Sequence, residues 1–251
     1  MFFADIFFLY CFLPICVAIY MLAKKIEHRN VVLIVFSLLF YSFGEPLMIF
    51  LLLVSVFINF LLARIIDFKR GERAAKIALM FALVYDIGML AVFKYTDFII
   101  DNINGITGLS ITPSGISLPL GISFYTFQII SYVIDVYWEK VDVQTKFHKL
   151  LLYVSLFPQL VAGPIVRYST VAAEIDNRTA TISDITAGAT RLIFGLSKKV
   201  LLANSLNLVV GELFGKDLTQ TTVLGTWLGV IAYSMYVYFD FSGYSDMAIG
   251  M

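Results

Sequence analysis

The stretch VLGTWLGVIAYSMYVYFDFSGYSDMAIGM, residues 223–251, contains the pattern that decides the fold of this chain. Its beginning is apolar enough to cross a lipid bilayer, whereas its end carries Asp240 and Asp246 on either side of Ser242 and Tyr244. An ionised carboxylate near the centre of a bilayer costs roughly 3 kcal/mol. We therefore expect these acids to lie in a polar environment inside a membrane protein, where that cost is offset.

The composition supports a membrane protein. Hydrophobic residues make up 60% of the chain and charged residues 14%, with 23 Phe and 14 Tyr. A soluble domain is about half apolar and about a quarter charged. The formal net charge is zero, so no basic surplus indicates a nucleic-acid partner, and the lipid bilayer is the expected partner.

Several apolar runs approach the roughly 20 residues that a membrane helix needs. They predict an all-α, polytopic membrane helix bundle with a single membrane-embedded domain over 1–251. Residues 31–43 are short, but Gly44-Glu45-Pro46 reverses the chain after them, which predicts a helical hairpin over 31–63. The predicted spans are 5–23, 46–63, 77–93, 118–138 and 223–241, and the runs 150–166 and 185–213 are apolar but interrupted.

The positive charges predict the topology. Eleven Lys and Arg residues follow the first, third and fifth apolar helices, whereas the intervening loops offer only Lys94. By the positive-inside rule the N-terminus is extracytoplasmic, and the polar stretch 97–117 is an external loop. No basic region precedes the first apolar segment and a basic stretch follows it, so we expect this segment to remain as the first membrane helix.

A second pattern predicts broken backbone at membrane depth. In LFPQLVAGPIVRYS, 156–169, Pro158 and Pro164 with Gly163 cannot sit in an unbroken helix. Irregular backbone is tolerated there only where it is buried in protein or lines a wet cavity. We therefore expect a discontinuous or re-entrant element flanked by Gln159 and Arg167. The alternative is a kinked helix with Arg167 extended to the interface.

Two further segments carry polar residues within apolar surroundings. In 118–138, Gln128 and Asp135 are seven apart and share a helical face, so they either bond between helices or line a polar cavity. The run 185–213 is interrupted by charges and amphipathic, which favours a helix at the membrane interface or beside a cavity over a simple span. Its charges are Arg191, Lys198 and Lys199.

Residues commonly used in catalysis are sparse. His28 and His148 lie in basic segments beside membrane helices, and we interpret both as non-catalytic solvated residues. We interpret Cys11 and Cys16 as buried thiols. No His/Cys/Asp cluster has the spacing of metal ligands, so we predict no metal and no bound cofactor.

The ordered motifs resemble the membrane-bound O-acyltransferase family, in its alginate O-acetyltransferase-like branch. The resemblance covers nearly the whole chain and matches the N-terminal half of the family pattern. The matching segments are YSFGEP (41–46), LPLGISFYTFQIISYVIDVY (118–137), FPQLVAGPIVRYS (157–169), LIFGLSKKVLLAN (192–204) and YFDFSGYSDMAIG (238–250).

The resemblance implies a helix bundle around a funnel, in which an acyl group from the cytoplasmic side is passed to a hydroxyl across the bilayer. It implies transfer of an acyl group, acetyl above all, to an exported polysaccharide such as alginate in the bacterial inner membrane, together with extracytoplasmic acetylation proteins. It leaves the acyl donor unidentified. D-alanyl transfer to teichoic acid is the alternative within the fold, and a polytopic transporter or channel is the alternative of another class.

In the family a catalytic histidine follows the segment that matches 238–250, and Met251 precedes that position. Neither His28 nor His148 matches it, so we expect the 251 residues alone to be inactive. The resemblance assigns structural roles instead, and it implies that 157–167 and 239–246 face the tunnel. For Asp240 and Asp246 we expect hydrogen-bonded structural roles near the reaction chamber, with proton transfer or exposure at a membrane face as alternatives.

Overall fold

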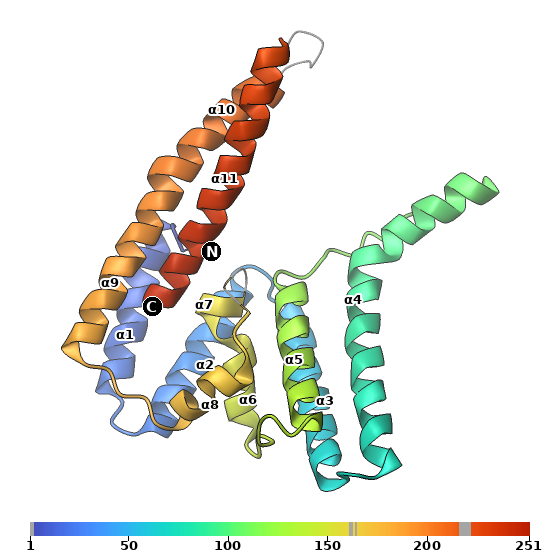
Figure 1. Ribbon diagram of the computed structural model, residues 1–251, viewed down its shortest axis with the longest axis vertical. Coiled ribbons are helices and arrows are strands. Elements are labelled where there is room, and N and C mark those ends of the chain that lie inside the picture. The colour runs from blue at the N-terminus through green and yellow to red at the C-terminus, as the bar shows by residue number, and fades with distance from the viewer. Residues whose placement is uncertain (1–2, 161–162, 164, 216–221) are drawn as a thin grey trace. The chain divides into compact units, whose positions relative to one another are not determined.

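The structure, a computed structural model, describes residues 3–160, 163, 165–215 and 222–251. These residues form helices joined by turns and loops, with no β-strand among them, which confirms the predicted all-α class (Figure 1). The elements are η1 (Phe8–Phe12), α1 (Leu13–Leu22), α2 (Ile26–Ser42), α3 (Met48–Phe68), α4 (Arg73–Thr107), α5 (Ile122–Tyr137), α6 (Phe147–Ser155), α7 (Phe157–Leu160), α8 (Tyr168–Asp176), α9 (Ile182–Ser197), η2 (Lys198–Ala203), α10 (Asn204–Phe214) and α11 (Val223–Gly250), where η marks a π-helical segment.

Among the described residues, three helical stretches are long and apolar enough to cross a membrane: α3, α4 and the continuous stretch Ile182–Phe214 formed by α9, η2 and α10. The predicted spans 46–63 and 77–93 fall within α3 and α4. The other predicted spans are helical as well, Phe8–Leu22 being shorter, and the total number of spans and their orientation stay predictions. The stretch predicted to lie at the interface, 185–213, has the length of a span.

The predicted external loop over 97–117 is wrong in its first part. Helix α4 continues to Thr107 and ends at Gly108, whose φ of 70° is left-handed and whose N–H donates to the carbonyl of Asn104. Glycine adopts this conformation at no steric cost, and it is a common helix end. Apolar residues continue at helical spacing between the polar ones, which explains why the helix extends this far.

By its internal contacts the chain divides into two compact units, each described by itself. The first comprises 1–17, 162–164 and 179–251, and the second comprises 18–161 and 165–178. The prediction of one domain over 1–251 is not tested by this division and stays a prediction.

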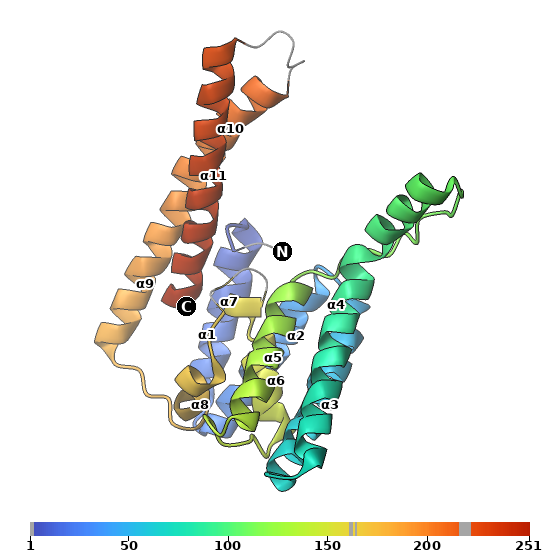
Figure 2. The ribbon, with the colours of Figure 1, turned by 45° about the vertical axis from the view of Figure 1, so that its right-hand side comes forward.

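The second unit contains a core of interlocking side chains. Helices α3, α4 and α5 pack on one another, and α6 packs on α2, α3 and α5 (Figures 1 and 2). Tyr125, Tyr132 and Val133 of α5 are fully buried, and Leu52 and Val56 of α3 meet them in the same cluster. Each large apolar side chain removed from water contributes about 1.5–3 kcal/mol relative to exposure. In lipid, where there is no water to leave, van der Waals contact between the packed side chains stabilises the helices instead.

Candidate functional site

In the first unit, α9–η2 and α11 pack side by side through glycines. Gly188 and Gly195 are seven residues apart on one helix, and Gly243 and Gly250 are seven apart on the other, so each pair lies on one face. A Cβ added to Gly195 would lie 2.6 Å from the Gly243 carbonyl oxygen, and one added to Gly188 would lie 2.6 Å from that of Gly250. The backbones therefore touch, in an antiparallel arrangement (Figures 1 and 2).

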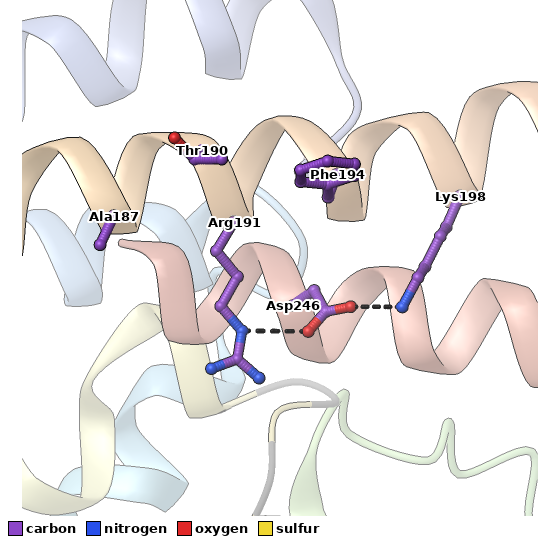
Figure 3. A pocket seen from close by; sticks show the side chains of 6 residues that line it. All are labelled: Ala187, Thr190, Arg191, Phe194, Lys198 and Asp246. Atoms are coloured by element: carbon purple, nitrogen blue, oxygen red, sulfur yellow. Dashed lines mark hydrogen bonds and ion pairs between the residues drawn. The ribbon is translucent and has the colours of Figure 1, made fainter.

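This close approach brings three cations to the two acids of α11. The carboxylate of Asp246 accepts from Arg191 Nε at 3.0 Å and from Lys198 Nζ at 2.6 Å (Figure 3). Asp240 is paired with Lys199. These ion pairs are the structural answer to how α11 carries two carboxylates, because a charge that is partly removed from water needs a partner to offset the loss.

The two lysines lie in a π-helical segment, where the helix is wider than an α-helix. Lys198 and Lys199 are the first two residues of η2, the π-helical segment that joins α9 to α10. Although consecutive, they reach different carboxylates on α11. Single π-helical turns of this kind occur often at functional sites.

The ion-paired side chains border an open depression of about 540 Å³. The side chain of Asp246 is 19% exposed and that of Arg191 is 49% exposed, and the terminal nitrogens of the guanidinium point away from the carboxylate in Figure 3. The depression therefore combines donors that are not used by the ion pair with an apolar wall. Its lining is Ala187, Thr190, Arg191, Phe194, Lys198 and Asp246.

The other two predicted residues of this segment lie between the ion pairs along α11. The hydroxyl oxygen of Ser242 is buried, with no hydrogen-bond partner among the described residues. The ring of Tyr244 stacks on Phe3, with ring centroids 4.4 Å apart. The Ser242 hydroxyl is thus a buried polar group that lies between Asp240 and Asp246 in sequence.

The predicted break in the second unit is present, and two backbone groups that it frees, the N–H of Phe157 and the carbonyl of Tyr153, have new partners. The helix stops at Leu156, and the N–H of Phe157 donates to the hydroxyl of Ser37 at 3.1 Å instead of continuing the α6 ladder. The Tyr153 carbonyl, which a continuing helix would have bonded to that N–H, accepts from the side-chain amides of Gln128 (3.0 Å) and Gln159. The two glutamines therefore hold a broken helix end in place.

Of the remaining predicted residues of the break, Pro158 and Arg167 belong to the second unit and Gly163 to the first. Pro158 is the second residue of α7, within the first turn, where its missing N–H removes no helix bond. Gly163 is buried, Arg167 is exposed immediately before α8, and Pro164 lies outside the described residues. The hydroxyl of Tyr153 donates to the carbonyl of Val166 at 2.9 Å, which ties α6 to the chain beyond the break.

Apart from Gly163, the described predicted site residues form two groups, one in each unit. Asp240, Ser242, Tyr244 and Asp246 belong to the first unit, and the group around Gln128 and Gln159 belongs to the second. That both groups line one passage stays a prediction.

The acids of α11 were predicted from the sequence, but the cations that pair with them were not. Arg191, Lys198 and Lys199 were recognised as charges in an apolar run, but not as partners of Asp240 and Asp246. The signal was the seven-residue glycine spacing on both segments. Aligning Gly195 with Gly243 in antiparallel order also aligns Gly188 with Gly250 and sets the cations opposite the acids.

No family model matches the chain, but individual relatives do. A protein of Pseudomonas aeruginosa named as a probable alginate O-acetylase AlgI is 38% identical over 251 residues, covering 97% of this chain and 47% of the relative. A peptidoglycan O-acetyltransferase of Helicobacter pylori is 32% identical, covering 97% of this chain and 52% of the relative. A teichoic acid D-alanyltransferase of Bacillus subtilis is 28% identical, covering 53% of this chain and 34% of the relative.

By these relatives the chain resembles the membrane-bound O-acyltransferase family along its own length. Within that family it is similar to alginate O-acetylases over almost its entire length. It spans about half the length of these curated relatives. The candidate spans and the bacterial relatives together indicate a bacterial membrane protein.

Proposed function

We propose that this chain forms membrane scaffold of a bacterial O-acyltransferase that transfers acetyl groups from the cytoplasmic side to hydroxyls of an extracytoplasmic polysaccharide. The observation that carries this proposal is the similarity over 97% of the chain to proteins named as O-acetylases and O-acetyltransferases of alginate and peptidoglycan. All of the relatives reported above are acyltransferases by name, which favours acyl transfer over a transporter or channel.

The chemistry of the reaction agrees with a polar interior. Acyl transfer to a hydroxyl needs a base for the alcohol proton, donors for the developing oxyanion and exclusion of competing water. The described residues offer a donor that could serve such a passage, namely the guanidinium of Arg191, whose side chain is 49% exposed. We infer that it lines the passage and that 157–167 borders the same passage, whereas the buried hydroxyl of Ser242 has a structural role.

The base is assigned to neither histidine of this chain. His28 is exposed in the first turn of α2, and His148 is half-buried in the first turn of α6, each in a basic segment. Both histidines belong to the second unit. A polypeptide of residues 1–251 alone is accordingly proposed to transfer no acetyl group.

The setting of the protein is part of the proposal. The distribution of Lys and Arg favours the bacterial cytoplasmic membrane with the N-terminus outside. An acceptor outside the cytoplasm would bring extracytoplasmic acetylation proteins as partners. The acyl donor is a co-substrate whose identity the proposal leaves open.

The experiment is deletion of the gene in its host, with measurement of ester-linked acetyl in the purified extracellular polysaccharide and cell wall. We expect acetyl ester to be lost and to return with the intact gene, but not with a gene that encodes residues 1–251 only. His28→Ala and His148→Ala variants of the intact gene are expected to restore acetylation fully. Acetyl ester that survives the deletion would reject the function, and failure of His148→Ala at normal protein level would reject the assignment of that histidine.

The similarity to a D-alanyltransferase supports a second candidate, D-alanyl transfer to teichoic acid, with lower identity and over about half of the chain. The same deletion strain separates the two candidates. Ester-linked D-alanine released by mild base falls only if this second activity is the correct one.

A further inference from the structure

Helix α4 is longer than a membrane crossing requires. Its 35 residues correspond to about 52 Å at 1.5 Å per residue, against about 30 Å of hydrocarbon. The predicted span within it covers 77–93. The outer segment of α4, defined here as Tyr95–Thr107, therefore extends beyond the part needed to cross the bilayer.

Exposed apolar side chains form a stripe along α4 and stay on the same face of the helix from its spanning part to its outer segment. In the spanning part it contains Phe81 and Val84, and in the outer segment it continues three, four or seven positions apart. Residues at these spacings share one helical face. The exposed members in chain order are Ile77, Met80, Phe81, Val84, Ile87, Val92, Tyr95, Phe98, Ile99, Ile103 and Ile106.

The opposite face of the outer segment is occupied by the following loop. The carboxylate of Asp97 accepts from the backbone N–H (2.7 Å) and the hydroxyl (2.6 Å) of Ser114. The side-chain amide of Asn104 donates to the carbonyl of Ile111 at 2.8 Å and accepts from its N–H at 2.9 Å. The loop is thus fastened to the polar face at two positions, and the stripe on the other face is left without a protein partner among the described residues.

The helix also changes direction in its outer segment (Figures 1 and 2). Near the start of this segment the hydroxyl of Thr96 donates to the carbonyl of Val92 at 2.5 Å. A threonine that bonds back to position i−4 bends helices in this way. Further along, Asn102, which stands within the stripe, donates to the carbonyl of Phe98 at 2.7 Å, so part of its amide is satisfied by its own helix.

We propose that the outer segment of α4 is a lipid-binding surface that lies in the membrane interface with Phe98, Ile99, Ile103 and Ile106 in the acyl region. The stripe is continuous with the apolar face of the spanning part of the same helix, which fixes lipid as the occupant. A segment that projected into water would expose the same four side chains at the cost of their hydrophobic transfer free energy.

The charge of the segment specifies the kind of lipid contact. Asp97 and Asp101 are the charged residues of the outer segment, which gives it a net charge of −2, and Lys94 directly precedes it. Anionic headgroups would therefore not attract this surface. The stripe is held by apolar burial about 5–10 Å into the boundary between headgroups and acyl chains, as in other interfacial helices.

The test is spin-label accessibility on the protein in liposomes of zwitterionic lipid. Single labels are placed at Ile103→Cys and Ile106→Cys in a Cys11→Ser/Cys16→Ser background, with Asp101→Cys as the matched control on the other face. Val84→Cys reports the spanning part. Collision with oxygen, which concentrates in the acyl region, is compared with collision with a water-soluble nickel chelate.

We expect labels at 103 and 106 to favour oxygen over the nickel chelate, less strongly than the label at 84, and the label at 101 to favour the nickel chelate. Adding anionic lipid is expected to change none of these ratios. Equal nickel access at 101, 103 and 106 would show that the segment projects into water. Protection of 103 and 106 from both reagents would show that a second protein surface covers the stripe, and either result overturns the proposal.

Discussion

The two compact units hold their helices together by different means. In the second unit, α2, α3, α5 and α6 interlock large side chains such as Tyr125, Tyr132 and Leu150, all fully buried. In the first unit, α9–η2 and α11 touch through backbone at glycines, while most of their large apolar side chains stay exposed. The same membrane environment thus admits both a side-chain core and a helix pair with almost no core.

The two arrangements also accommodate polar groups differently. In the second unit buried amides complete broken backbone, as Gln128 does for the Tyr153 carbonyl. In the first unit close backbone approach lets short and long charged side chains meet across the helix pair. A helix pair that depends on a few glycines is expected to be much less tolerant of an added carbon atom than one that depends on many interlocking side chains.

The largest effect is expected from Gly195→Ala. The new Cβ would lie 2.6 Å from both the Gly243 carbonyl oxygen and the Met247 amide nitrogen, so the helices must separate. Overpacking of this kind costs about 1–3 kcal/mol, and loss of the ion pairs on separation places this substitution at about 3 kcal/mol. The measurement is unfolding of the purified protein from mixed micelles by added denaturing detergent.

Two glycine substitutions serve as controls for helix propensity. A Cβ at Gly211 of α10 or at Gly88 of α4 would meet nothing within 4 Å. Alanine is favoured over glycine in helices by up to about 1 kcal/mol, so Gly211→Ala and Gly88→Ala are expected to be neutral or stabilising. If Gly195→Ala behaves like these two, the helix pair does not depend on backbone contact.

The next effect concerns the ion pair of Asp240 and Lys199. Asp240→Asn leaves the ammonium of Lys199, which is 23% exposed, without its partner. We expect a loss of about 2 kcal/mol, because removing one member of a partly buried pair leaves an uncompensated charge. The double variant Asp240→Asn/Lys199→Gln is expected to regain most of this stability. Single losses that simply add in the double variant would show that the pair is not coupled.

The sequence predicted the elements of the fold because their signals are local. Apolar length predicted α3 and α4, and proline spacing predicted the break after Leu156, since a missing N–H acts on its own helix turn. The extent of α4 was predicted wrongly because Asn102, Asn104 and Gly105 are typical of a loop in composition. All three lie within the helix, which ends at Thr107, and the side chain of Asn102 donates to a carbonyl of the same helix.

The candidate site was predicted only in part because partners depend on tertiary contact. Asp240 and Asp246 were identified from their cost in a membrane, which one helix reveals. Their cations lie 41 to 55 residues away in sequence, and only the antiparallel glycine contact brings them together. Ser37 was likewise unpredictable, since it is 120 residues from the N–H that it accepts.

A smaller effect is expected at the broken element, because its carbonyl has two donors. With Gln128→Ala, the Tyr153 carbonyl keeps the amide of Gln159, so about 1 kcal/mol is lost, the net worth of one hydrogen bond. Gln159→Ala is expected to cost a similar amount. The double variant leaves the carbonyl unsatisfied and is expected to cost more than the sum, by the same detergent unfolding. Strict additivity would indicate that the amides act independently.

The smallest effect is expected at the exposed pair between Glu27 and Lys146, which joins two basic segments of the second unit. The ammonium of Lys146 donates to the carboxylate at 3.0 Å and holds the pKa of Glu27 below its ordinary value. Because the pKa is lowered in the folded protein, the pair stabilises the fold above the unfolded pKa of about 4.3, and this contribution is lost as the pH falls through the folded value. Exposed pairs contribute little, so Lys146→Gln is expected to leave the unfolding midpoint at pH 7 nearly unchanged. The same variant is expected to raise the pKa of Glu27 toward its ordinary value, measured from the carboxyl ¹³C shift during titration, whereas an unchanged pKa would show that the ammonium is not the cause.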